Sequence, residues 1–204
     1  MKLETTIKKV IIALIGNCIL GAGVAMISQP CLGADPSVSF SQAYAPYLGL
    51  SIGQAITITN IVLLVITFMV KKSNIGIATF IVVFLNQYPV DFVTSIIPKT
   101  GNMVINIVWI LLGISFVAIG CNVIIASRLG MGILDAFVFG IADRVNKTFV
   151  FVRYITDSIF FLCTILLKGY FGIGTILAYL LTGPTIKYTK PLVEGTIKKL
   201  VKLD

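Results

Sequence analysis

The chain has 204 residues, of which 57% are hydrophobic and only 12% are charged, and its mean hydropathy is +1.02. This apolar share exceeds that of an ordinary soluble domain, which excludes water as the main solvent of the folded chain. The net charge of +8 comes from lysines and arginines spread beside apolar runs, which argues against a nucleic-acid-binding patch. Histidine is absent, which removes the usual proton shuttle and metal ligand.

Six apolar stretches approach or reach the roughly 20 residues that a helix needs to cross the hydrocarbon core. They predict membrane spans near residues 8–28, 51–70, 75–97, 103–127, 148–168 and 170–187. Two segments between spans are too short to cross and predict short helices near 35–47 and 132–145, either re-entrant or interfacial. The sequence therefore predicts an all-α integral membrane protein of about six transmembrane helices.

The basic residues predict the orientation of the chain. With a cytoplasmic N-terminus, only Lys99 and Lys168 face outward, and the other fourteen lysines and arginines lie on or near the cytoplasmic side. This bias predicts a multi-pass protein of the bacterial cytoplasmic membrane with both termini inside. The pattern of apolar and lysine residues over 188–204 predicts a basic amphipathic helix on the inner leaflet, and the alternative is a solvated tail.

An internal repeat divides the chain into two halves, residues 1–102 and 103–187, followed by the tail. At an offset of 97 residues, Gly23 aligns with Gly120, Leu32-Gly33 with Leu129-Gly130, and Asn60 with Asp157; after a one-residue slip, 76–79 aligns with 172–175. Because each half has three crossings, an odd number, the second half is expected to be inverted in the membrane. Inverted repeats with broken segments are typical of many secondary transporters.

Several motifs carry a resemblance to a known family. They are GAGVAMISQPCLGADPS at 21–37, GLSIG at 49–53, GIAT and GIGT at 76–79 and 172–175, VRYITD at 152–157 and TGP at 182–184. The chain resembles the YczE/YyaS/YitT family of bacterial membrane proteins over nearly its whole length. The resemblance implies a polytopic membrane protein and leaves its biochemical role open.

Ionisable side chains within a span are costly and normally face the bundle interior. Arg153 and Asp157 stand four residues apart, on one face of the expected fifth span. They are interpreted either as a proton, cation or anionic-substrate site, or as an ion pair that fixes packing. Asn60, the repeat partner of Asp157, either shares that site or forms an interhelical hydrogen bond.

The breaks before the two short helices are a second candidate site. Leu32, Gly33, Gly130 and Gly132 would present helix N-termini, whose free amides favour anions, and the alternative is a structural elbow. Asp35 would cap its own helix there and weaken anion binding. Asp135, in the second short helix, would line an entry path.

The leading functional hypothesis is a small-solute transporter or permease of unknown substrate. The alternative is a non-transporting component: an accessory subunit, a sensor, or a substrate-binding unit that needs a partner. No catalytic constellation or nucleotide-binding motif is present, so we expect neither an enzyme nor a cofactor. The cysteines lack metal-site spacing. The expected partners are the lipid bilayer, an unknown small solute, and either a second copy or a partner membrane subunit.

Overall fold

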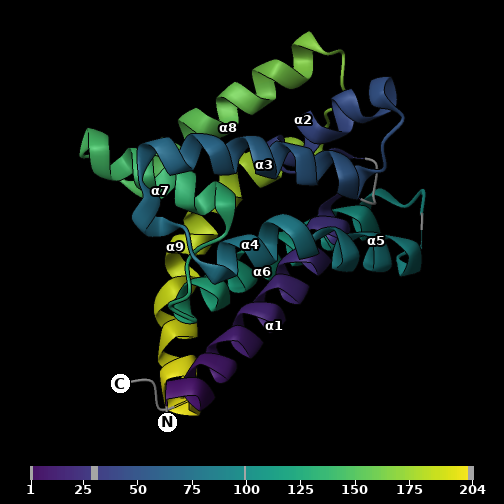
Figure 1. Ribbon diagram of the computed structural model, residues 1–204. Helices are drawn as coiled ribbons and strands as arrows, with labels where there is room; N and C mark the ends of the chain where they lie inside the picture. The colour runs from purple at the N-terminus through teal and green to yellow at the C-terminus, as the bar shows by residue number, and fades with distance from the viewer. Residues whose placement is uncertain (1, 29–31, 99, 202–204) are drawn as a thin grey trace.

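The computed structural model describes residues 2–28, 32–98 and 100–201, which form helices joined by turns (Figure 1). The helices are α1 (Lys2–Ser28), α2 (Pro36–Tyr44), η1 (Ala45–Leu48), α3 (Ile52–Val70), η2 (Lys72–Asn74), α4 (Ile77–Leu85), α5 (Gln87–Ile96), α6 (Met103–Ala126), α7 (Ile133–Val145), α8 (Phe149–Leu166) and α9 (Ile173–Val201). No strand occurs among these residues, which confirms the predicted all-α class. The short helices expected near 35–47 and 132–145 are α2 with η1, and α7.

Within the described ranges, four helices are long and apolar enough to cross a bilayer: α1, α3, α6 and α8. The expected third span is two helices, α4 and α5, which meet at Asn86 with a bend of 42° and would count as a fifth span if taken together. Pro89 explains the bend, because proline has no amide hydrogen to donate to the carbonyl of Leu85 and its ring crowds that carbonyl.

Helix α9 continues from the expected sixth span into the expected tail, up to Val201. It is not among the helices apolar enough to count as spans, and Lys187 and Lys190 interrupt its apolar part. Pro184 lies inside this helix and leaves the carbonyl of Leu180 without its usual donor. The hydroxyl of Tyr154 on α8 donates to that carbonyl at 2.9 Å, which ties the two helices together.

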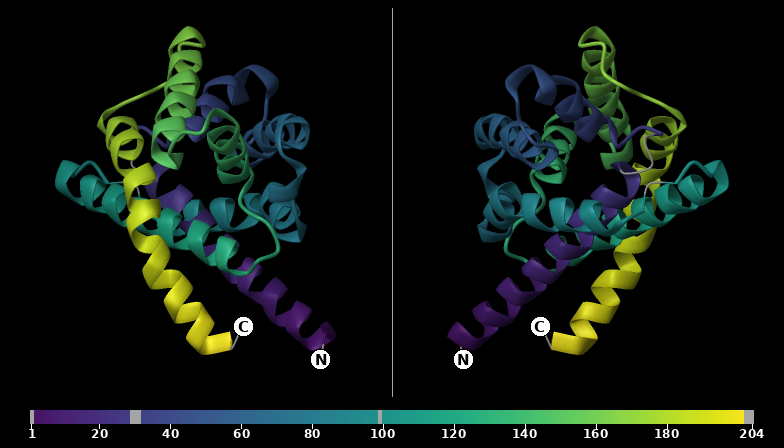
Figure 2. Two further views of the ribbon diagram at one scale, coloured as in Figure 1. Left: turned by 90° about the vertical axis from the view of Figure 1, so that its left-hand side faces the viewer. Right: turned by 90° about the vertical axis from the view of Figure 1, so that its right-hand side faces the viewer.

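Helices α1 and α6 cross with their backbones in contact, as the two views of Figure 2 show. A Cβ added at Gly23 would lie 2.6 Å from the backbone nitrogen of Val117, and one added at Gly120 would lie 2.5 Å from that of Leu20. A larger residue at either position would force the helices apart. The buried core around this crossing includes side chains of α4 and α9 as well.

Each break before a short helix is held by the opposite half of the chain. Gly33 has φ +106° and Gly130 has φ +121°, values that favour glycine. The carbonyl of Leu32 accepts from the amide of Gly174 at 2.7 Å, and the carbonyl of Leu129 accepts from the amide of Ala78 at 3.0 Å. Both breaks are thus elbows that lie against the first turn of a helix in the other half.

The short helices also pack across the two halves. Helix α2 packs on α8, and α7 packs on α3. Figure 1 shows α3 and α8 running in opposite directions, with the α3–α4 turn at one side of the view and the α8–α9 turn at the other. The starts of α2 and α7 are thereby brought to the same interior region, next to the middle of α8.

Candidate functional site

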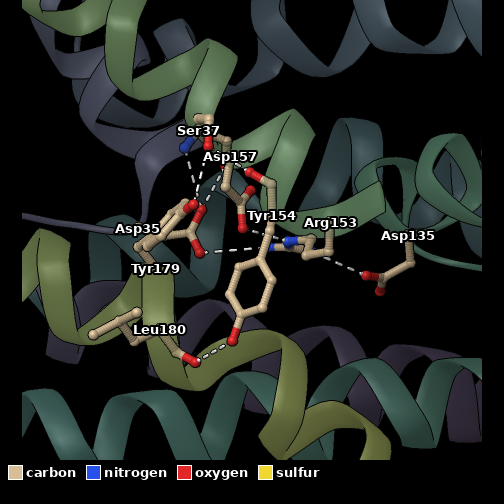
Figure 3. A network of polar contacts seen from close by, with 9 residues as sticks. Asp35, Ser37, Asp135, Arg153, Tyr154, Asp157, Tyr179 and Leu180 are labelled. Carbon is tan, nitrogen blue, oxygen red and sulfur yellow. Dashed lines mark hydrogen bonds and ion pairs between the residues drawn. The ribbon is translucent and has the colours of Figure 1, made fainter. Parts of the chain in front are cut away.

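Arg153, in the first half of α8, is the centre of a buried network of charged side chains (Figure 3). Its Nε donates to Asp157 Oδ2 at 2.9 Å, one turn along the same helix. Its Nη1 donates to Asp135 Oδ1 at 3.2 Å, and its Nη2 donates to Asp35 Oδ2 at 3.3 Å. All four residues are buried, and Asp157 is fully so. The network therefore joins α8 to both short helices.

Asp35 has two roles, one for each carboxylate oxygen. Oδ1 caps α2 by accepting from the amide of Ser37 at 3.2 Å and from its hydroxyl at 2.8 Å. Pro36 occupies the first helical position, where its missing amide hydrogen costs nothing. Oδ2 is left to bind Arg153. This geometry confirms the predicted cap and shows that a carboxylate already occupies the N-terminus of α2.

Asp135 lies in the first turn of α7, where the helix dipole favours a negative charge. Its carboxylate accepts a hydrogen bond from Arg153 on α8. It is 3% exposed, so the carboxylate lies inside the protein. Asp135 thus connects α7 to α8.

The network carries more negative than positive charge. Three carboxylates at −3 and one guanidinium at +1 sum to −2 when all four groups are ionised. Asp157 Oδ1 is buried and has no hydrogen-bond partner in the described part of the chain. Each of the three guanidinium nitrogens already donates to a carboxylate, which uses three of the five guanidinium N–H groups. With the carboxylates ionised, their excess of negative charge disfavours an anionic solute.

A cavity of about 90 Å³ lies beside the network, between the two halves of the chain. Its lining comes from α1, the start of α2, α3, α4 and its joint with α5, α6, the start of α7, and α8. The polar lining residues are Asp35, Ser37, Asn60, Asn86, Cys121, Asp135 and Arg153. At about 30 Å³ for each water, the cavity has room for about three waters, or for one small solute.

The structure brings together most of the residues singled out from the sequence. Asp35, Asn60, Gly132, Asp135 and Arg153 line the cavity, and Asp157 lies directly behind them.

Leu32, Gly33 and Gly130 are not part of that lining. They form the elbows, where Gly33 lies against Thr175 and Gly130 lies against Gly76. The sequence left two interpretations open for these three residues, an anion site and a structural elbow. Their surroundings fit the structural elbow.

Three polar residues of the lining were not singled out as site residues from the sequence: Ser37, Asn86 and Cys121. Cys121 lies in an apolar run, where a thiol is usually a small hydrophobic group. The sequence did contain a signal for Asn86. It stands three residues before Pro89, and a proline inside a helical run indicates a break at which a polar side chain can lie. Its side-chain oxygen is buried without a hydrogen-bond partner among the described residues.

No group of three or more cysteine, aspartate or glutamate side chains within the described ranges is placed to hold a metal ion. The carboxylates surround the guanidinium on different sides and do not converge on one point (Figure 3). The three described cysteines, Cys18, Cys121 and Cys163, form no disulfide. The site is a network of charged side chains with an adjoining cavity.

Comparison with known proteins identifies relatives but no activity. A model described as "Family of unknown function (DUF6198)" matches residues 7–191. The uncharacterized protein YyaS of Bacillus subtilis is 22% identical over 183 residues, which cover 88% of this chain and 91% of the relative. The uncharacterized membrane protein YczE of the same organism is 25% identical over 177 residues, with coverage of 86% and 82%. These relatives confirm the resemblance to the YczE/YyaS family, and no solved structure matches significantly.

Proposed function

The chain belongs to the family of unknown function DUF6198, and on that premise we propose that it is a transporter or permease for a small solute. It acts in the bacterial cytoplasmic membrane as a carrier, without catalytic chemistry and without a cofactor. The observation that carries this proposal is a polar, charged cavity enclosed by apolar helices at the interface of two related halves. Transporter sites typically occupy this position.

Reciprocal contacts support the proposal that the halves are inverted repeats. The elbow bonds Leu32–Gly174 and Leu129–Ala78 join equivalent positions in the two directions, at the offsets of 97 and 96 residues seen in the sequence. The packing of α2 on α8 and of α7 on α3 is reciprocal in the same way. Such an exchange is what a twofold axis in the membrane plane produces.

The cavity lies where that axis would pass. Many of its lining residues belong to pairs related by the 97-residue offset. These pairs are Leu20 and Val117, Val24 and Cys121, Asp35 and Gly132, Ser37 and Leu134, Val38 and Asp135, and Ile56 and Arg153. The shape of the site is therefore shared between the halves, while its charge is not, because the first half has Ile56 where the second has Arg153.

In the proposed membrane orientation, α4 with α5 forms the third crossing and the first part of α9 forms the sixth. Both termini then lie in the cytoplasm, with the α3–α4 turn inside and the α8–α9 turn outside. The ends of α1 at Lys2 and of α9 at Val201 lie at the same end of the molecule, as this requires (Figure 2). The short helices α2 and α7 would each begin near the cavity and run toward opposite faces of the membrane.

A ligand screen followed by an uptake assay tests the proposal. The purified protein in detergent is screened by thermal shift against amino acids, organic anions, organic cations, vitamins and thiols. A ligand at about 100 times its Kd should stabilise the fold by about 2.7 kcal/mol. The compound is then offered to liposomes that contain only this protein. Uptake above that of empty liposomes supports a transporter, whereas binding without uptake contradicts it.

We predict that Asp157→Asn weakens binding of any stabilising compound at least about tenfold, the loss expected for one charge-assisted interaction. Asparagine can still accept from Arg153 Nε, so the fold should survive. The matched control is Asp143→Asn, because Asp143 is an exposed carboxylate that pairs with Lys71 at the surface. Unchanged affinity in Asp157→Asn would mean that the charged network only fixes the packing of α8.

A second candidate, a non-transporting subunit, is favoured by a different feature. An apolar groove of about 850 Å³ lies between α1 and α9, with Ile11, Ile15, Ile119, Leu192 and Val193 in its lining. A groove of this kind would accept an apolar helix of a partner or of a second copy. Absence of uptake, together with a stable oligomer or co-purified membrane subunit whose binding is lost in Ile15→Asn, would favour this second function.

A further inference from the structure

We infer that the cavity beside Arg153 binds a small organic monocation, a primary ammonium ion with a short apolar body. This inference rests on the proposed function, since it names the class of solute that the same cavity would take. Three features of the cavity point to this class: its charge, an unpartnered polar oxygen, and a lining that combines charged with apolar side chains.

The charge of the site favours a cation. When all four groups are ionised, the sum of −2 leaves the carboxylates under-compensated. Asp35 and Asp135 both line the cavity, and each uses one oxygen to accept from Arg153. Arg153 is the one cationic side chain in the described lining, and three of its five N–H groups donate to carboxylates. A single positive charge in the cavity would offset part of the excess.

Asn86 supplies an acceptor that the protein itself does not use. It lines the cavity at the joint between α4 and α5 and is 5% exposed. Its Oδ1 has no hydrogen-bond partner in the described part of the chain. Leaving a buried acceptor unpaired costs about 1–3 kcal/mol. An ammonium group has three donors and no acceptor, and therefore matches carboxylates together with an amide oxygen.

The cavity also has an apolar lining. Its apolar side chains include Leu20 and Val24 of α1, Val82 of α4 and Val117 of α6. A cation with a hydrocarbon body would place its head at the aspartates and its chain among the apolar side chains. Since the cavity has room for about three waters, the solute is expected to have about three to five non-hydrogen atoms. An alkylammonium ion with a chain of two to four carbons has this size.

The first test compares ligands of equal size on the unmodified protein in detergent. Thermal stability is measured against butylammonium chloride, sodium butyrate and 1-butanol, and the ammonium series is extended from ethyl to hexyl. We expect saturable stabilisation by butylammonium and none by butyrate or butanol. Stabilisation by butyrate equal to that by butylammonium, or no saturable stabilisation by any ammonium ion, would overturn the inference. Equal stabilisation by sodium chloride would overturn the inference that the bound cation is organic.

Two variants of lining aspartates and one control then locate the site. Asp135→Asn and Asp35→Asn should each raise the Kd for butylammonium at least about tenfold, the loss expected for one charge-assisted hydrogen bond. Asp91→Asn, at an exposed carboxylate on α5, is the matched control and should leave the Kd unchanged.

Asn86→Leu separates binding from folding. It should raise the Kd while leaving thermal stability unchanged or higher, because it removes an unpaired buried oxygen without changing the size of the side chain much. A purely structural asparagine would lose stability without this effect on the Kd. An unchanged Kd in all three lining variants would overturn the inference.

Uptake of radiolabelled butylammonium into proteoliposomes distinguishes this inference from the proposed function. Binding without uptake retains the cation site and contradicts the transporter. Uptake of a different solute that competes with no ammonium ion retains the transporter and overturns the cation site.

Discussion

Replacing Arg153 with leucine is expected to lower the free energy of unfolding by about 3–5 kcal/mol, the usual loss when one partner of a buried ion pair is removed. The reason is electrostatic: Asp35, Asp135 and Asp157 would remain buried without the only guanidinium that contacts them in the described structure. The loss should appear as a lower thermal unfolding temperature in detergent and a smaller monodisperse peak in size-exclusion chromatography.

Two further variants sharpen that prediction. Arg153→Lys should recover only part of the stability, because an ammonium group cannot present the planar fork that reaches three carboxylates at once. Arg144→Leu is the matched control, since Arg144 is exposed and makes only a long contact to the carbonyl of Met69. Equal stability of Arg153→Leu and Arg144→Leu would show that the carboxylates do not depend on Arg153.

The second large effect is expected at the elbows. In Gly76→Ala the new Cβ would overlap the carbonyl oxygen of Leu129, and in Gly172→Ala it would overlap that of Leu32. Both obstacles are backbone atoms, which cannot rotate away, and each substitution also strains an elbow hydrogen bond. We expect each variant to lose about 2–4 kcal/mol of stability, from overpacking together with a weakened hydrogen bond.

The glycine prediction has its own control in Gly195→Ala. Gly195 lies in α9, and a Cβ there would meet no atom within 4 Å. Alanine is favoured over glycine in a helix by up to about 1 kcal/mol, so this variant should be as stable as the parent or more stable. The prediction fails if Gly76→Ala and Gly172→Ala unfold at the same temperature as Gly195→Ala.

Much of the helical arrangement could be predicted from the sequence, because long apolar runs leave few alternatives to a membrane helix. The expected spans near 8–28, 51–70, 103–127 and 148–168 correspond closely to α1, α3, α6 and α8. The bend between α4 and α5 was missed although its cause is local, because Pro89 lies in a run whose overall hydropathy resembles that of an unbroken span. Hydropathy alone does not report a lost backbone hydrogen bond.

The candidate site could be predicted only in part. Arg153 and Asp157 share a helix, so their spacing predicted their contact. Asp35 is 118 residues from Arg153, and only the packing of α2 on α8 brings them together. The sequence therefore indicated Asp35 as a cap and Asp135 as a residue of an entry path. Tertiary structure alone brings three carboxylates to one arginine. It also leaves the side-chain oxygen of Asn86 buried without a partner among the described residues.

The inversion of the two halves is tested most directly by the sidedness of two equivalent turns. Ser73 and Tyr170 are 97 residues apart, are both exposed, and lie between α3 and α4 and between α8 and α9. Each is replaced by cysteine in a chain whose four native cysteines are alanine, and intact cells are treated with a membrane-impermeant maleimide. Inverted halves predict that Tyr170→Cys is labelled at once and Ser73→Cys only after permeabilisation. Labelling of both positions from the same side would contradict the inverted repeat and the cavity shared between its halves.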